Sequence, residues 1–228
     1  NQLQQLQIDE QKEIMRVLQI LSEKVSKYAN KIENNIETIA RLDLAFARAR
    51  HAETLTATQP ILLPWNEDNN QTSDNISHGY TIKLLGARHP LLSKTDVVAI
   101  DFIIDKHTKI IVITGPNTGG KTVSLKTIGL LSLMAASGLH IPVEPGSALP
   151  IFSGVFADIG DEQSIKQSLS TFSSHINNIK NILENIDSRS LVLLDEIGAG
   201  TDPDEGSALA QALLEYVLQN GSMAVVTT

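Results

Sequence analysis

Apolar residues recur at helical spacing through the first quarter of the chain. Residues 1–59 contain no Gly and no Pro, and their apolar side chains follow at intervals of three and four: Ile14, Leu18, Leu21, Val25, Tyr28, Ile32, Ile36 and Ile39. This spacing predicts one very long helix or two consecutive helices, with the lowest helix propensity at Asn34–Asn35. The stripe fits an amphipathic helix packed on its own domain or an intermolecular coiled coil, and neither alternative involves chemistry.

The pattern changes after residue 79, where short apolar runs begin to alternate with segments of helix length. Strands are predicted at 80–85, 97–104, 110–113, 152–159, 191–194 and 223–227, and helices at 123–137, 172–186 and 205–220. From Ile110 onward this order is typical of an α/β domain with a mainly parallel sheet and right-handed crossovers. The strands before Ile110 are expected to form an antiparallel side sheet.

Three regions follow from these patterns. Residues 1–59 form a helical segment that ends at Gln59–Pro60, since the residue before a proline disfavours helix. Residues 60–79 are predicted to be a linker containing a polar surface loop, because 66–78 hold almost no apolar side chains. Residues 80–228 are the predicted α/β domain.

Composition narrows the class of protein. The net charge is −8, and residues 58–228 carry 10 basic and 18 acidic residues, so a basic nucleic-acid-binding face is not expected in this chain. There is no Cys and no apolar run of membrane-spanning length, which favours a reducing, cytoplasmic location without a membrane partner. Both ends look like cuts through a longer chain, because there is no initiating Met and the last residues follow directly on a predicted strand.

The first candidate site is a glycine-rich loop between the apolar run Ile110–Ile113, which predicts a buried strand, and the predicted helix 123–137. Residues 115–122, Gly-Pro-Asn-Thr-Gly-Gly-Lys-Thr, fit the pattern G-x-x-x-x-G-K-[ST]. In such a loop the backbone N–H groups and the helix N-terminus surround phosphate oxygens. Lys121 is then expected to reach the β- and γ-phosphates of ATP, and the Thr122 hydroxyl to bind Mg²⁺. The alternative is a glycine-rich turn that matches by chance.

The second candidate is a pair of acids directly after the apolar run 191–194. A continuous apolar run predicts a buried parallel strand, and ligands bind at the carboxyl ends of such strands. Asp195 is expected to hold Mg²⁺ through a water molecule. Glu196 is expected to orient or deprotonate the attacking water. The alternative is a solvated acid at a strand end, which the phosphate-loop pattern 74 residues upstream disfavours.

With these residues assembled, the chain resembles the MutS family of ABC-type ATPases, and within it the bacterial MutS-II branch. The segments that carry the resemblance are 87–92 (Ala-Arg-His-Pro-Leu-Leu), 115–122, 138–142, 157–163 (Ala-Asp-Ile-Gly-Asp-Glu-Gln), 168–174 and 191–204. The match is specific over 80–228 and looser over 1–59, which are similar to the family's helical core and lever region. The expected fold is therefore a P-loop NTPase of ABC type.

The resemblance implies a site shared by two protomers in a head-to-tail homodimer. Ser170, which by spacing alone could equally be only a helix N-cap, would contact the γ-phosphate bound by the partner chain. Gly200–Thr201 would lie at the dimer interface. The implied catalytic residues are Glu196, Lys121 and Ser170 in trans. The implied ATP-binding residues are Gly115, Pro116, Asn117, Thr118, Gly119, Gly120, Lys121, Thr122, Val123 and, near adenine, Val97 and Val98.

The resemblance also implies a role for the intact protein. ATP-driven dimer closure is expected to move a helical clamp that acts on branched DNA, suppressing recombination, or on stalled ribosomes. The chain ends at Thr228, before the family's switch His, and lacks the C-terminal dimerisation helices and nuclease-like domain. This piece is therefore expected to bind nucleotide better than it hydrolyses it. Two alternatives remain: a nucleotide-binding dimerisation module without turnover, and another ABC-type head. The second is disfavoured because Ser-Leu-Ser-Thr-Phe stands where those heads carry Leu-Ser-Gly-Gly.

Overall fold

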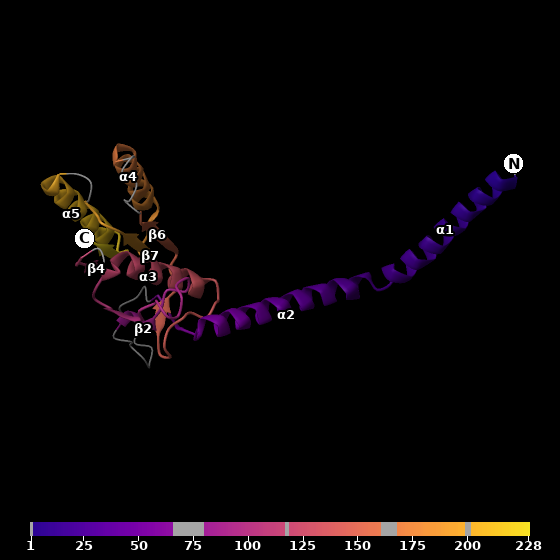
Figure 1. Ribbon diagram of the computed structural model, residues 1–228, viewed down its shortest axis with the longest axis horizontal. Helices are drawn as coiled ribbons and strands as arrows, with labels where there is room; N and C mark the ends of the chain where they lie inside the picture. Colours follow the sequence, from indigo (N-terminus) through magenta and orange to yellow (C-terminus); the bar gives the residue numbers. More distant parts are fainter. Residues whose placement is uncertain (1, 66–79, 117–118, 161–167, 199–201) are drawn as a thin grey trace. The chain divides into compact units, whose positions relative to one another are not determined.

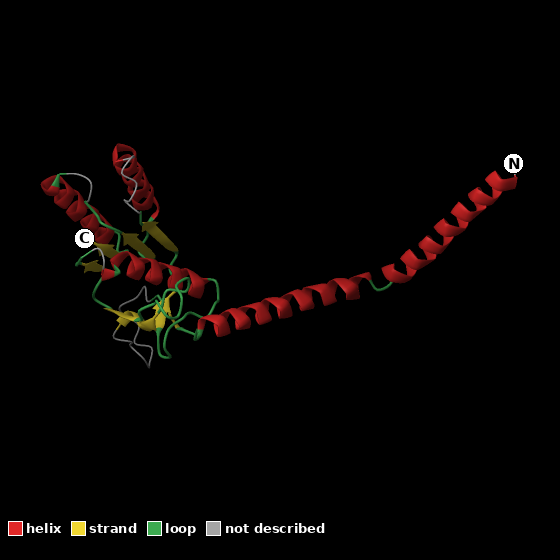
Figure 2. Cartoon of the chain, in the orientation of Figure 1, coloured by secondary structure: helices red, strands yellow, loops and turns green. Residues whose placement is uncertain are grey.

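The structure, a computed structural model, describes residues 2–65, 80–116, 119–160, 168–198 and 202–228 (Figures 1 and 2). The side chains of Tyr80 and of residues 168–174 lie outside this description. The chain divides into two compact units, residues 1–50 and 51–228. The predicted loop 66–78 lies outside the described residues.

The first unit is helical. Helix α1 (Gln2–Ser26) and helix α2 (Ala29–Leu55) are separated by a turn at Lys27–Tyr28, where the Tyr28 N–H donates to the Val25 carbonyl at 2.9 Å. The interruption therefore falls before Asn34–Asn35, which lie inside α2. Every described side chain of residues 2–50 is exposed, including the apolar stripe. Both interpretations of that stripe remain predictions. No helix in the described ranges is long and apolar enough to cross a membrane.

The second unit contains a parallel sheet in the order β4-β8-β7-β6. Its strands are β4 (Ile110–Ile113), β8 (Met223–Thr227), β7 (Ser190–Leu194) and β6 (Gly154–Asp158), and each adjacent pair is parallel. The predicted parallel sheet is therefore confirmed. All residues of β7 and β8 are buried, as expected for central strands. The prediction that β4 is buried was wrong, because β4 is an edge strand of the described sheet and its Val112 is 47% exposed.

A second sheet has the order β1-β5-β2-β3. Strand β2 (Tyr80–Ala87) runs antiparallel to β3 (Ile100–Asp105) and to β5 (Ala148–Pro150), whereas β1 (Ile61–Leu63) runs parallel to β5. The side sheet is thus mixed rather than antiparallel. It also contains β5, which comes after the glycine-rich loop in the chain. Trp65 follows β1 and packs edge-on against Phe152, with the two ring centroids 5.6 Å apart.

Helix α3 (Lys121–Ala136) lies between the two sheets. Its buried Leu125, Ile128 and Leu131 share one core with Ile82 of β2 and Leu193 of β7. Side chains alternate along a strand, so Val192 and Leu194 point to the opposite face. There they pack with Ile182 of helix α4 (Ser168–Asn185) and Val217 of helix α5 (Pro203–Gln219). This arrangement places the carboxyl ends of β4, β7 and β8 beside the start of α3.

Candidate functional site

The glycine-rich loop leads directly into α3. Gly120 has a φ of 79°, a left-handed conformation that suits glycine, and the first helical bond runs from the Ser124 N–H to the Gly120 carbonyl at 2.9 Å. Before it, the Gly119 N–H donates to the Pro116 carbonyl at 2.9 Å and closes a turn. The first N–H groups of an α-helix have no partner within the helix. The start of α3 therefore offers donors and the positive end of the helix dipole to an anion.

Lys121 is the most enclosed charged side chain at this loop, with only 6% of its surface exposed. Its Nζ donates to the Gly115 carbonyl at 2.7 Å and to the Thr228 carbonyl at 2.6 Å. A buried ammonium group requires such polar partners because burial removes it from water. The amine is thus held between the start of the glycine-rich loop and the residue after β8.

The other residues predicted to bind nucleotide lie in the glycine-rich loop, at the start of α3 and before β3. Thr122 follows Lys121 in the first turn of α3 and is half-buried, and Val123 is 41% exposed. Val97 and Val98 lie in the segment before β3, where Val98 is 80% exposed. The strand predicted over 97–104 begins only at Ile100. Asn117 and Thr118 lie outside the described residues.

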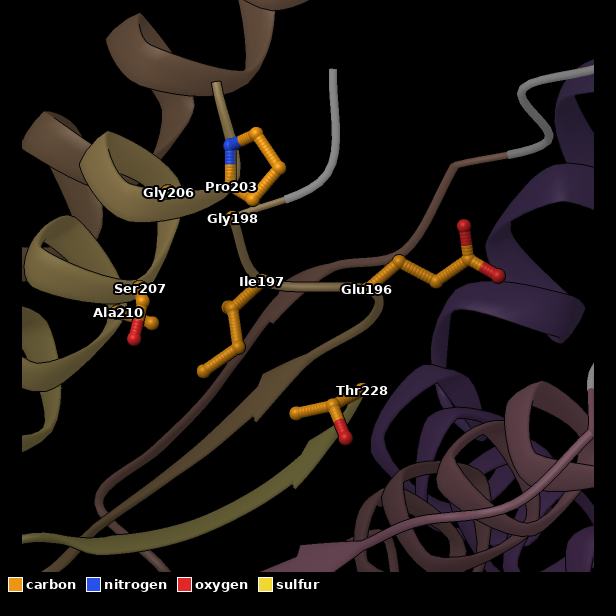
Figure 3. A pocket seen from close by; sticks show the side chains of 8 residues that line it. All are labelled: Glu196, Ile197, Gly198, Pro203, Gly206, Ser207, Ala210 and Thr228. Carbon is orange, nitrogen blue, oxygen red and sulfur yellow. The ribbon is translucent and has the colours of Figure 1, made fainter. Parts of the chain in front are cut away.

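The two predicted acids follow β7 and are joined by one hydroxyl group. Thr227, the last residue of β8, is fully buried, and its Oγ1 donates a short hydrogen bond to Oδ1 of Asp195. The same Oγ1 accepts from the Glu196 N–H at 2.8 Å. Glu196 has a φ of 48°, which is rare for a residue with a side chain. Its carboxylate extends away from α5 in Figure 3.

Asp195 is also held by β6, the strand that flanks β7 on the side away from β8. Its N–H donates to the carbonyl of Asp158, the last residue of β6, at 2.9 Å. Asp158 is 8% exposed, and its carboxylate contacts α4, where Nδ1 of His175 lies 2.9 Å from Oδ2 and Nδ2 of Asn178 donates to Oδ1 at 2.8 Å. Ser170 lies in the first turn of the same helix, and its side chain is outside the described residues. Helix α4 is thereby joined to the strand end next to Asp195.

A pocket of about 480 Å³ opens beside Glu196 (Figure 3). Its lining residues are Glu196, Ile197, Gly198, Pro203, Gly206, Ser207, Ala210 and Thr228. Gly198 lies against Gly206 of α5 so closely that a Cβ on Gly206 would be 2.3 Å from the Gly198 carbonyl oxygen. The Asp202 carboxylate caps α5 by accepting from the Asp204 N–H at 3.0 Å. Gly200 and Thr201 lie outside the described residues.

The structure brings the two candidate motifs together at the end of β8. Lys121 contacts the carbonyl of Thr228, and Asp195 and Glu196 contact the hydroxyl of the neighbouring Thr227. Sequence reasoning assigned no role to Thr227, Asp158, His175 or Asn178. The position of Thr227 at the end of an apolar run was visible, but the sheet order that places β8 between β4 and β7 was not.

The loop, the helix start and the acids define an α/β protein with a glycine-rich loop and a carboxylate pair at the carboxyl edge of a parallel sheet. Comparison with known families agrees, because residues 111–228, about half of the chain, match the family model of MutS domain V. The chain belongs to the MutS family, whose domain V has an ATPase-type fold. The resemblance predicted from the motifs is confirmed.

Similarity over all 228 residues of this chain is found with curated MutS2 proteins. The chain is 51% identical over its 228 residues to the MutS2 protein of Bacillus subtilis, covering 27% of that protein. It is 52% identical over the same span to the endonucleases MutS2 of a Geobacillus species and of Halalkalibacterium halodurans, again covering 27% of each. The chain therefore spans about a quarter of the length of the curated relatives it matches. These matches confirm the MutS-II branch.

Proposed function

We propose that this chain carries the ATP-binding and hydrolysing domain of a MutS2-like protein. The observation that carries the proposal is the convergence of Lys121, Asp195 and Glu196 on Thr227–Thr228, since it puts a buried amine and two carboxylates at one end of the sheet. Phosphoryl transfer depends on such positioned charges. A match to the glycine-rich pattern alone would not bring the acids to the loop.

The side chains present fit ATP and Mg²⁺. Lys121 would exchange its two carbonyl contacts for phosphate oxygens, and the backbone N–H groups of Gly119–Val123 would surround the same anion. Thr122 and Asp195 would hold Mg²⁺, Asp195 through water, because hydroxyl and carboxylate oxygens are the ligands this cation prefers. The bound cation would neutralise charge on the phosphates. Glu196 would orient or deprotonate the attacking water.

A second protomer completes the site in this proposal. Ser170 of one chain would contact the γ-phosphate bound by the other, in a homodimer formed through the ATPase domains. Support comes from its place in the first turn of α4, a helix end that can approach an anion. Val97 and Val98 are proposed to lie near the adenine, where exposed aliphatic side chains can cover a base.

The intact protein would couple ATP binding to movement. Residues 1–59 would act as a helical lever, residues 60–79 as a linker, and residues 80–228 as the ATPase domain that drives dimer closure. The relatives' printed name, endonuclease MutS2, supports a nucleic-acid partner. The family resemblance implies that this partner is branched DNA, with recombination suppression as the outcome. Stalled or collided ribosomes are the rival partner. Any nuclease activity would lie outside this chain, and a cytoplasmic location is proposed.

The experiment measures ATP turnover of the intact protein alone, with branched DNA and with ribosomes. Stimulation by one partner identifies it, and absence of ATP turnover under all three conditions overturns the proposal as an enzyme. Light scattering with ATP, run beside single-turnover hydrolysis, separates the alternative: a nucleotide-binding dimerisation module scatters more light with ATP but releases no phosphate.

A further inference from the structure

Thr227 is the residue on which both candidate acids depend. It is fully buried at the end of β8, and its hydroxyl gives its one proton to Oδ1 of Asp195 while a lone pair accepts from the Glu196 N–H at 2.8 Å. The hydroxyl therefore has no proton left for another acceptor. A valine, which has the same shape, would fill this position equally well if packing were its only task.

The backbone of Glu196 shows why these bonds matter. A φ of 48° places Glu196 in the left-handed region, which is unfavourable for a residue with a Cβ. Two backbone N–H groups at this position donate to Thr227. The Glu196 N–H donates to the Thr227 hydroxyl at 2.8 Å, and the Ile197 N–H donates to the Thr227 carbonyl at 3.3 Å. Strained conformations persist where several contacts over-determine them and gather at functional sites. Thr227 supplies two such contacts.

Asp195 is fixed between two strands. In the parallel register Leu194 lies opposite Val226, so Asp195 and Thr227 continue the same ladder. The Asp158 carbonyl holds the Asp195 N–H on one side, and Thr227 holds Oδ1 on the other. Within the described ranges Oδ2 has no hydrogen-bond partner, so this oxygen is the one available to a metal-bound water.

We infer that Thr227 is a positioning residue for the proposed hydrolytic site: its hydroxyl orients Asp195 toward the cation and holds Glu196 in its left-handed conformation. The inference rests on the proposed function, since it assigns the two acids their roles in ATP hydrolysis. Thr227 itself touches neither nucleotide nor cation. It acts through the two carboxylates, as residues behind metal ligands generally do.

The test compares Thr227→Val with Thr227→Ser in the intact protein. Affinity for a fluorescent ATP analogue is measured with Mg²⁺ and with EDTA, beside ATP turnover and a urea unfolding curve. Thr227→Val should weaken Mg²⁺-dependent affinity by about 10-fold or more, as loss of a residue behind a metal ligand does, and change affinity in EDTA by less than about 2-fold. Thr227→Ser keeps the hydroxyl and should stay within about 3-fold of the wild type in both.

The matched control is Thr127→Val, since Thr127 is a buried threonine of α3 whose hydroxyl donates only to the Val123 carbonyl, at 2.7 Å. It should lower stability but leave the Mg²⁺ dependence unchanged. If Thr227→Val behaves like this control, Thr227 is structural and the inference fails. If the wild type binds no nucleotide, the proposed function fails instead. Should Thr227→Val not fold, Thr227→Ser is compared with Thr227→Ala, which differs from it by the hydroxyl alone.

Discussion

Nδ1 of His175 lies 2.9 Å from Oδ2 of Asp158, and this contact joins α4 to the carboxyl end of β6. Asp158 is nearly buried, and its carbonyl in turn holds the N–H of Asp195. The helix that carries Ser170 and the strand next to the proposed Mg²⁺ ligand are therefore connected through one aspartate. In the proposed dimer, a shift of α4 would reach Asp195 through this connection.

We predict that His175→Ala destabilises the protein by about 1 kcal/mol, because a buried carboxylate loses one of its hydrogen-bond partners. The free energy of unfolding in urea at neutral pH measures this. The control is Lys180→Ala on the same helix, whose exposed side chain lies 3.8 Å from Glu184 and should contribute less than about 0.5 kcal/mol. Equal effects for the two variants would show that the His175–Asp158 contact adds no stability.

The contact between Gly198 and Gly206 should tolerate no side chain. We predict that Gly206→Ala lowers the free energy of unfolding by about 1–3 kcal/mol, because its Cβ would be 2.3 Å from the Gly198 carbonyl oxygen and the backbone must shift. Ser207→Ala, at the next and exposed position, is the control and should change stability by less than about 0.5 kcal/mol. A wild-type unfolding curve for Gly206→Ala would contradict the close packing described here.

Acid should weaken the fold through Asp187. Hydrogen bonds from the Ser153 hydroxyl, the Ser190 hydroxyl and the Arg189 N–H hold the pKa of this carboxyl below its usual value of 3.8. A depressed pKa in the folded state means that the stabilisation is complete above the unfolded pKa and is lost as pH falls through the folded one. The free energy of unfolding should therefore drop between about pH 5 and pH 2, and less so in Asp187→Asn.

Glu215→Gln, which removes an exposed carboxylate from α5, serves as the control for that series. Its free energy of unfolding should fall with decreasing pH as that of the wild type does. If Asp187→Asn instead shows the same fall in stability as the wild type, the hydrogen bonds to Asp187 do not contribute to acid sensitivity.

Nucleotide binding should require the amine of Lys121. We predict that Lys121→Ala abolishes detectable ATP binding, because the loop loses the charge that meets the phosphates. Fluorescence titration with an ATP analogue measures this in the intact protein. Lys126→Ala, an exposed lysine of the same helix, is the control and should bind ATP with near wild-type affinity. Unchanged affinity in Lys121→Ala would remove Lys121 from the phosphate site.

The parts of the fold that the sequence predicted are those with a strong local pattern. The loop between Ile110–Ile113 and α3 was predicted because glycines, lysine and threonine stand at fixed offsets, and β7 and β8 because they are continuous apolar runs. Strands β1 and β5 were missed because each has three residues and lies beside or includes proline, too short for any period to show. Strand β4 was predicted at its observed bounds, but its partial exposure was not, because burial depends on sheet order, which no local pattern contains.

In the candidate site, too, the residues with a local sequence pattern were predicted and those that depend on tertiary contacts were not. Lys121, Asp195 and Glu196 were predicted because each stands next to a recognisable strand or loop. Thr227 and the Asp158–His175 contact were not, because both depend on tertiary contacts: β8 pairs with β7, and His175 of α4 reaches back to the end of β6. A threonine at the end of an apolar run and a histidine in a helix carry no signal until those neighbours are known.

In the proposed site Glu196 serves hydrolysis and not binding, and Glu196→Gln tests this role. Single-turnover ATP hydrolysis and ATP affinity are measured in the intact protein, with Glu184→Gln, an exposed acid of α4, as the control. We predict that Glu196→Gln binds ATP like the wild type but hydrolyses it about 10²–10⁴-fold more slowly, the usual contribution of a general base. Hydrolysis at the wild-type rate in Glu196→Gln would show that Glu196 does not act on the attacking water.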